Sequence, residues 1–332
     1  MKPKTLYRDI LKNAFNIAFK NKTLWFFGLL AAPLMGMAEY KIAANIFEGT
    51  NGGFIFGEWS QIINTVISQF GNISNLLAEN PAALIILLAF FSVIILFVFF
   101  LFWIAVVAQG ALIDGINQTN SKTMINSKPN TSISCGIKNF FPVLGIHFFV
   151  KLGITLSFLL LSLPIVVIAI GNNDVLPKIL YFVFSLIFIP IIIIIMFSSK
   201  YAINYIIIEK ENFFDGIKKG YRMFFDNWLI SIEMSLILFF ISVFAGLFIV
   251  VVGSFIILPI TLLIYILIQI KLIFLVKFVL VLGLLILIIL SLFFTAIFSV
   301  FQYSNWVLLF NRLKKGGEKE KGKLARWFSF EH

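Results

Sequence analysis

The chain has 332 residues, of which 61% are hydrophobic and only 12% are charged, and its formal net charge is +11. Because soluble domains contain about 25% charged residues, this composition excludes an ordinary soluble protein. The positive charge does not indicate nucleic-acid binding, since the cations lie beside long apolar runs, where they set topology and attract anionic lipid head groups. The composition therefore predicts an all-α polytopic membrane protein whose partner is the lipid bilayer.

Six apolar runs are long enough to cross the hydrocarbon core, which needs about 20 apolar residues. We expect a bundle of about six transmembrane helices within one integral membrane domain over 1–332, with spans at Thr23–Ala38, Ala82–Ala108, Phe141–Ile170, Leu180–Met196, Trp228–Val252 and Lys277–Leu309. The first run is short and follows a basic segment, so a signal peptide is the alternative there. No clean small-residue cleavage site follows it, which favours a retained span.

The connections between these spans differ in charge. Of the 26 lysines and arginines, 21 lie on one side, in the amino-terminal segment, the second and fourth connections and the carboxyl-terminal tail. Positive charge stays in the cytoplasm, so we expect both termini to be cytoplasmic in the plasma membrane. Trp25, Trp228 and Trp306 lie near the same ends of their spans, where indole rings favour the interface.

Several connecting segments carry structure of their own. We expect an interfacial basic helix over 1–22, an external loop with an amphipathic helix over 39–80, and a basic cytoplasmic tail over 310–332. The apolar run from 228 to 310 is longer than two crossings need. We therefore expect an outer-leaflet excursion or a re-entrant turn around Gly253, Pro259 and Lys271.

A weak internal repeat accompanies the spans. "GIKNFF" at 136–141 and "GIKKGY" at 216–221 each precede a span that enters from the cytoplasm, and "NAFNIAFKNKTLWFFGLL" from Asn13 has the same place before the first span. This layout predicts three hairpins, each introduced by a surface helix.

These stretches also carry a family resemblance. "LKNAFNIAFKNKTLWFFGLLAAPL", "AQGALIDGI" and "IIEKENFFDGIKKGYRMFFDNWLISI" resemble the membrane domain associated with glycerophosphoryl diester phosphodiesterases, and related multi-pass bacterial membrane proteins of unknown function. The resemblance implies a six-helix membrane module, and it implies no activity. The soluble barrel that carries the active site in those enzymes has no counterpart here, so no catalytic residue is carried over.

Residues that could perform chemistry are scarce. The chain has a single cysteine, Cys135, and two histidines, His147 and His332, and it contains neither a phosphate-binding glycine loop nor a histidine and acid cluster at metal-ligand spacing. We therefore expect no cofactor, no metal and no catalytic site.

Three polar residues lie inside apolar spans and form the candidate buried cluster: His147, Lys151 and Glu233. Lys151 and Glu233 are expected at similar depth, because both spans enter from the cytoplasm, and His147 is one turn from Lys151 on the same helix face. Three interpretations remain open. The cluster is a structural ion pair, Lys151 snorkels to the interface without a partner, or the cluster is a site for a proton, an ion or an anionic substrate.

A second candidate site is the basic amphipathic segment "FFDGIKKGYRMFFDNW". Its aromatic and aliphatic residues are expected to face lipid: Phe213, Phe214, Ile217, Tyr221, Phe224 and Phe225. Lys218, Lys219 and Arg222 are expected to meet lipid phosphates. The alternative is a juxtamembrane helix that only sets topology.

The sequence thus predicts a non-enzymatic integral membrane protein. Its expected role is that of an accessory or scaffold module that binds anionic lipid at the cytoplasmic face, or a membrane-protein partner. The alternative is a transporter or permease-like protein for a small or lipidic substrate, with His147, Lys151 and Glu233 as its site.

Overall fold

The computed structural model describes residues 6–35, 81–120, 129–169 and 175–316, and every regular element in these ranges is a helix. The elements in chain order are α1 (Leu6–Lys20), α2 (Lys22–Ala31), the short 3-10 helix η1 (Ala32–Leu34), α5 (Pro81–Asn120), α6 (Pro129–Lys138), α7 (Phe140–Ala169), α8 (Val175–Ile208), α9 (Phe213–Asp226), α10 (Trp228–Gln269) and α11 (Ile273–Gly316).

The described residues divide into two compact units. The larger unit contains α1, α2, the end of α5 from Val106 onward, and all helices from α6 to α11. The smaller unit contains Pro33–Met35 and the part of α5 up to Ala105. The sites discussed below lie in the larger unit.

Five of the described helices are long and apolar enough to cross a membrane: Ile85–Asn120, Phe140–Ser157, Leu186–Ile208, Trp228–Gln269 and Ile273–Gly316. Large hydrophobic side chains are exposed along most of their length, which is stable only where lipid replaces water. The chain is therefore an all-α integral membrane protein, and the fold class predicted from the sequence is confirmed. Its first expected span is a shorter apolar helix, Lys22–Leu34, and the remainder of that span lies largely outside the described residues.

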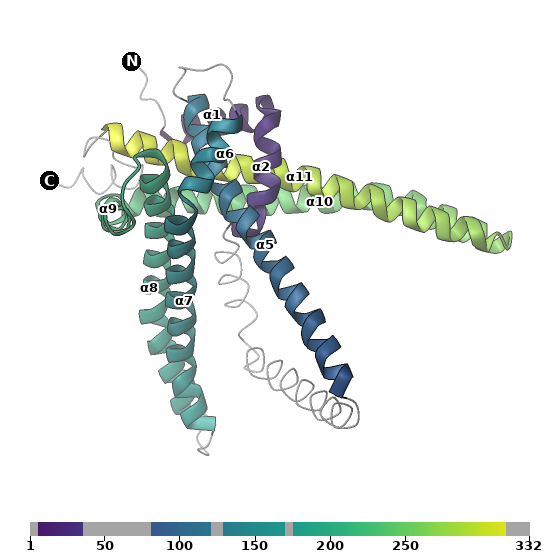
Figure 1. The fold of residues 1–332 in the computed structure, drawn as a ribbon, viewed down its shortest axis with the longest axis horizontal. Coiled ribbons are helices and arrows are strands. Elements are labelled where there is room, and N and C mark those ends of the chain that lie inside the picture. The colour runs from purple at the N-terminus through teal and green to yellow at the C-terminus, as the bar shows by residue number, and fades with distance from the viewer. Residues whose placement is uncertain (1–5, 36–80, 121–128, 170–174, 317–332) are drawn as a thin grey trace. The chain divides into compact units, whose positions relative to one another are not determined.

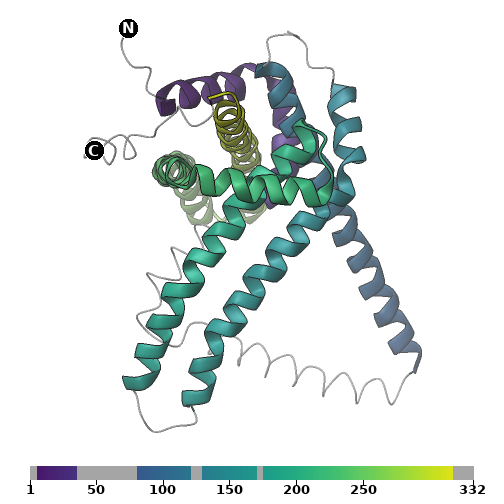
Figure 2. The same ribbon diagram turned by 90° about the vertical axis from the view of Figure 1, so that its left-hand side faces the viewer.

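Helices α7 and α8 run side by side as one hairpin, and α10 packs along α11 as another (Figures 1 and 2). Of the three residues expected at a turn, Gly253 and Pro259 lie inside the continuous helix α10, so the expectation is wrong for them. The chain does reverse at the third, Lys271, whose φ of 60° is left-handed. There the N–H groups of Leu272 and Lys271 donate to the carbonyl oxygens of Leu267 and Ile268, both at 3.0 Å. This is a Schellman cap with lysine in place of the usual glycine.

Buried side chains gather at one end of the long helices. We call this region the head; it comprises α1, α2, α6 and α9 with residues 106–120, 140–150, 192–208, 228–238 and 296–316. The apolar remainders of the long helices are called the arms. The α11 arm, residues 273–295, is about 35 Å long at 1.5 Å per residue, which matches a hydrocarbon core of about 30 Å. The head is thus a packed core, and the arms are the parts suited to lipid.

Each of the short helices α1, α6 and α9 packs against the end of a long helix: α1 on α11, α6 on α5 and α9 on α8. The α6 and α9 contacts use two buried small residues four positions apart, Ser132 and Gly136 in α6 and Gly216 and Gly220 in α9. Helix α1 has two buried alanines at the same spacing, Ala14 and Ala18. Small residues at this spacing let two helix backbones approach closely. The docking therefore recurs three times, as an internal repeat would require.

The structure also corrects the alignment of that repeat. A Cβ built on Gly136 would lie 2.2 Å from the carbonyl oxygen of Val107, and one on Gly220 would lie 2.7 Å from the carbonyl oxygen of Ser198. Gly136 therefore corresponds to Gly220 and not to Gly216, the residue that the "GIK" match would pair with it. The sequence match is therefore displaced by one helical turn. The repeated "GIK" letters do not mark equivalent positions, because the glycine that packs on the long helix decides which residues correspond.

A single asparagine joins each short helix to the next one. Its side-chain Nδ2 donates to the carbonyl oxygen four residues earlier, at 3.2 Å for Asn21, 3.0 Å for Asn139 and 3.2 Å for Asn227. Its own carbonyl oxygen accepts a backbone N–H from the first turns of the following helix, from Leu24, Val143 and Ser231 respectively. One residue type thus satisfies backbone groups of two helices at each bend.

Candidate functional site

His147 lies on α7 and joins that helix to α5. Its Nε2 is 2.6 Å from Oε1 of Gln109, a buried amide in the part of α5 that belongs to the head. Because an amide oxygen only accepts hydrogen bonds, Nε2 is the donor in this pair. His147 therefore links α7 to α5 by a hydrogen bond.

Glu233 lies on α10, where the Tyr7 hydroxyl of α1 donates a hydrogen bond to its Oε2. The two residues are 226 positions apart in the chain, so the contact fixes the amino-terminal helix to the start of the last hairpin. Glu233 and Tyr7 each take part in further interactions. A hydrogen bond to a carboxylate is a strong one, and it makes Glu233 part of the head's packing.

The expected buried cluster of His147, Lys151 and Glu233 is wrong in this form. Lys151 is exposed on α7, and within the described residues it forms no ion pair. The expectation compared depths along two helices, but α7 pairs with α8 while α10 pairs with α11. Lys151 and Glu233 therefore do not meet, even if they lie at the same depth along their helices. Exposure of Lys151 agrees with the snorkelling interpretation, in which the long side chain reaches the interface.

Other polar contacts hold the head together. Between α8 and α10, the Tyr201 hydroxyl lies 2.7 Å from Ser231 Oγ, and between α11 and α10 the Gln302 amide donates to Ser242 Oγ at 2.8 Å. At the helix ends, Asn311 of α11 donates to Asn117 of α5 at 2.9 Å. Such bonds satisfy polar groups within the packed head and fix which helices lie together.

Most of the basic segment "FFDGIKKGYRMFFDNW" forms α9, and the two faces of this helix differ. Gly216 and Gly220 face α8, and Phe224, expected to face lipid, is buried and stacked on Phe197 with ring centroids 5.6 Å apart. That expectation was wrong because α8 covers this side of the helix.

The opposite face of α9 carries both aromatic rings and cations. Phe214, Tyr221 and Phe225 are 80%, 52% and 44% exposed, and Lys218, Lys219 and Arg222 are exposed as well. Lys219 Nζ donates to Glu211 at 2.5 Å, which raises the pKa of its ammonium, and Arg222 lies 3.8 Å from Asp226. Sequence and structure thus agree on an amphipathic cationic face.

Within the described ranges, no group of three His, Cys, Asp or Glu side chains lies close enough together to hold a metal ion. The exposed face of α9 presents cations beside aromatic rings, and this combination is suited to binding anionic head groups.

Sequence reasoning missed several residues of the head. Gln109 and Gln302 are amides inside apolar helices, and that rarity was the signal that would have identified them. Tyr7 gave no such signal, because its partner is distant in the chain.

No protein-family model, curated protein or solved structure matches this chain.

Proposed function

We propose that the chain is a non-enzymatic membrane module that binds anionic lipid at the cytoplasmic face of the plasma membrane and serves as a scaffold for a membrane partner. The observation that carries the proposal is the two-faced packing of α9. Two glycines hold one face against α8, while Lys218 and Arg222 stay exposed beside aromatic rings on the other. A helix held in this way presents its cations in a fixed position to lipid phosphates.

Two sequence features support the orientation and the accessory role. The cations concentrate on the side of the expected spans that includes α9, and positive loops stay cytoplasmic. The resemblance to the membrane domain associated with glycerophosphoryl diester phosphodiesterases supports a module that works beside an enzyme.

The test is lipid binding by the purified protein in neutral detergent, with bound lipids counted by native mass spectrometry. Phosphatidylglycerol is titrated against phosphatidylcholine for the wild type and for the double variant K218Q/R222Q. Each cation near a membrane surface contributes about 1 kcal/mol, so we expect phosphatidylglycerol affinity to fall roughly ten- to thirtyfold. Lys219 is left intact because replacing it would also remove the hydrogen bond that it donates to Glu211.

The matched control is K271Q/K277Q, which removes the same charge at the far end of the α10 and α11 hairpin. We expect its affinity to stay within about twofold of the wild type, since head-group attraction falls off within a Debye length of ~10 Å. Equal loss in both double variants, or no preference for phosphatidylglycerol, would count against α9 as the binding face. A saturable solute flux in reconstituted vesicles that survives K218Q/R222Q would favour the transporter alternative.

A further inference from the structure

A groove of about 400 Å³ lies between α1, α10 and α11. Its walls are Phe15 and Phe19 of α1, one side of α10 between Ile241 and Val252, and one side of α11 between Leu290 and Phe301. All of its lining residues are apolar, and its size lies within the range of about 300–1,000 Å³ typical of ligand sites.

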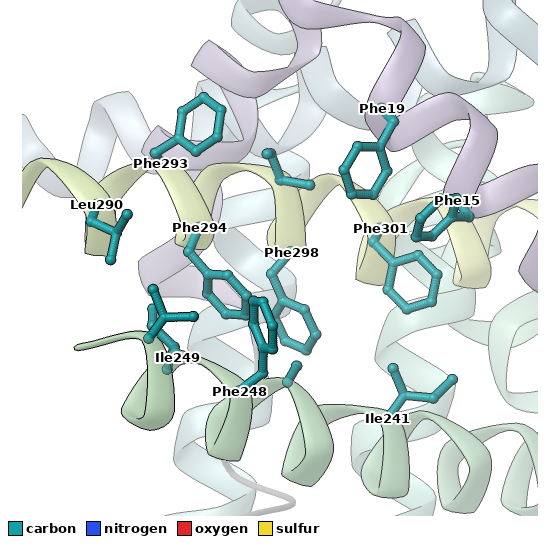
Figure 3. Close-up of a pocket in the computed structure, with 13 residues that line it drawn as sticks. Phe15, Phe19, Ile241, Phe248, Ile249, Leu290, Phe293, Phe294, Phe298 and Phe301 are labelled. Atoms are coloured by element: carbon teal, nitrogen blue, oxygen red, sulfur yellow. The ribbon is translucent and has the colours of Figure 1, made fainter. Parts of the chain in front are cut away.

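The groove is lined along α11 from Leu290 to Phe301. Figure 3 shows the rings of Phe248, Phe294 and Phe298 gathered between α10 and α11, with Phe15 and Phe19 reaching over from α1 beside Phe301. From Leu290 to Phe301 the α11 wall is about 17 Å long at 1.5 Å per residue. An apolar wall of this length fits an extended hydrocarbon chain better than a compact solute.

The charged residues near the groove favour one kind of head group. Arg8, Lys12 and Lys20 are exposed on α1, and Lys12 lies one turn before Phe15 on the same face of the helix. The Glu233 carboxylate, in contrast, is engaged by Tyr7. The α1 end of the groove therefore offers exposed cations next to an apolar wall, which is complementary to a phosphate ester carrying an acyl chain.

We infer that this groove is a specific site for one acyl chain of an anionic phospholipid, whose phosphate meets the cations of α1. The site differs from the head-group surface of α9, because it recognises the hydrocarbon chain and lies between other helices. It also gives α1 a role as a lipid clamp, in addition to its packing against α11.

The test exploits two adjacent residues of α10. Ala245 lines the groove, whereas a Cβ on Gly246 would meet nothing within 4 Å. Native mass spectrometry with phosphatidylglycerol is applied to the wild type, A245L and G246L after delipidation. We expect one tightly held lipid in the wild type and in G246L, and at least tenfold weaker binding in A245L, because the added side chain fills the channel.

Further variants and competitors identify which part of the lipid is bound. We expect K12Q to weaken phosphatidylglycerol and to leave phosphatidylcholine unchanged, and we expect the soluble head group glycerophosphoglycerol not to compete. K218Q/R222Q should keep the tight lipid, so loss at α9 and loss at the groove are distinguishable. Equal retention of the tight lipid by A245L and G246L, or more than one lipid held this tightly by the K218Q/R222Q variant, would overturn the inference. Conversion of a wild-type dimer to a monomer by A245L would instead assign the groove to a second copy.

A measurement on the wild type guards against misfolding of A245L. Trp25 stacks edge-on against Phe293 of the groove wall, with ring centroids 5.1 Å apart. A phosphatidylglycerol brominated in mid-chain should quench Trp25 fluorescence, seen as the difference between the wild type and W25F. Absence of this quenching at saturating lipid would also overturn the inference.

Discussion

At the residue scale, polar side chains in this apolar protein act mainly as links between helices. His147 bonds to Gln109, Glu233 accepts a hydrogen bond from Tyr7, and Lys200 lies 4.3 Å above the ring of Trp306 as a cation–π pair. Each contact joins two helices, so the polar groups stabilise the tertiary arrangement within the head.

The polar contacts of Glu233 lead to a double-mutant prediction. We expect E233Q and Y7F each to destabilise the protein, by about 1–3 kcal/mol, and the pair to be strongly non-additive because one interaction is lost in both. K151M should leave stability unchanged, and its combination with E233Q should be additive. Thermal unfolding in detergent measures all three effects. Rescue of E233Q by a charge change at Lys151 would restore the ion-pair interpretation.

The single cysteine allows a prediction about pH. Partial burial, and then the negative charge of Asp114, raise the pKa of the Cys135 thiol. A raised pKa means less thiolate at a given pH, so alkylation of the folded protein should be slow at neutral pH and should accelerate only above the ordinary thiol range. D114N should lower the pKa and speed alkylation at fixed pH. Denatured protein is the control, and equal rates in folded and denatured protein would contradict the prediction.

At the element scale, the short helices depend on close backbone approach. A Cβ on Gly220 of α9 would lie 2.6 Å from the backbone nitrogen of Ala202 and 2.7 Å from the carbonyl oxygen of Ser198. Neither atom belongs to a flexible side chain, so α9 would have to move away from α8. This is why the sequence keeps a glycine inside a helix, where glycine costs about 1 kcal/mol relative to alanine.

We therefore expect G220A to lower stability by about 1–3 kcal/mol through overpacking. The control is G246A in α10, where the added Cβ meets nothing within 4 Å and stability should be unchanged or slightly increased. Thermal unfolding of the two variants in one detergent decides the matter. Equal melting temperatures would mean that α9 is not docked on α8 as described.

The asparagine junctions give a second prediction for the elements. Replacing Asn139 or Asn227 by alanine removes a side-chain hydrogen bond to the preceding helix and should cost about 1 kcal/mol at each site. Asn212 precedes α9 but makes no side-chain cap hydrogen bond, so N212A should have little effect. Unfolding midpoints of the three variants would test the rule, and a large loss in N212A alone would refute it.

At the scale of the larger unit, burial separates the helices into a head and arms. Residues 296–313 of α11 are mostly buried, whereas 273–295 are mostly exposed and apolar. A water-soluble protein could not maintain such arms, because exposing apolar surface costs about 25 cal/mol per Å². Lipid removes this cost, so the arms are stable only within a membrane.

This division predicts the result of a topology experiment. In a C135S background, single cysteines replace Lys218 in the head and Lys271 at the tip of the last hairpin. A membrane-impermeant maleimide should label the two positions from opposite sides of sealed vesicles, with Lys218 on the cytoplasmic side. Labelling of both from one side would mean that the hairpin does not cross the bilayer.

The sequence by itself determined the class of the protein, the helical state of its elements and the cationic face of α9. These features depend on composition and on residue spacing along one helix, and both can be read from the sequence. It also indicated a repeat, but it aligned the repeat one turn away from the packing glycines.

Only the tertiary structure decided which helices touch. Helix α7 pairs with α8, and α10 pairs with α11, so Lys151 and Glu233 lie on different hairpins. Glu233 accepts a hydrogen bond from Tyr7 instead. The sequence named Lys271 as one of three turn candidates in the long arms. It did not single Lys271 out, because apolar periodicity is absent in helices exposed to lipid on most sides. Contacts such as Gly136 on Val107 depend on backbone approach between distant segments, and no pattern within a single helix encodes that distance.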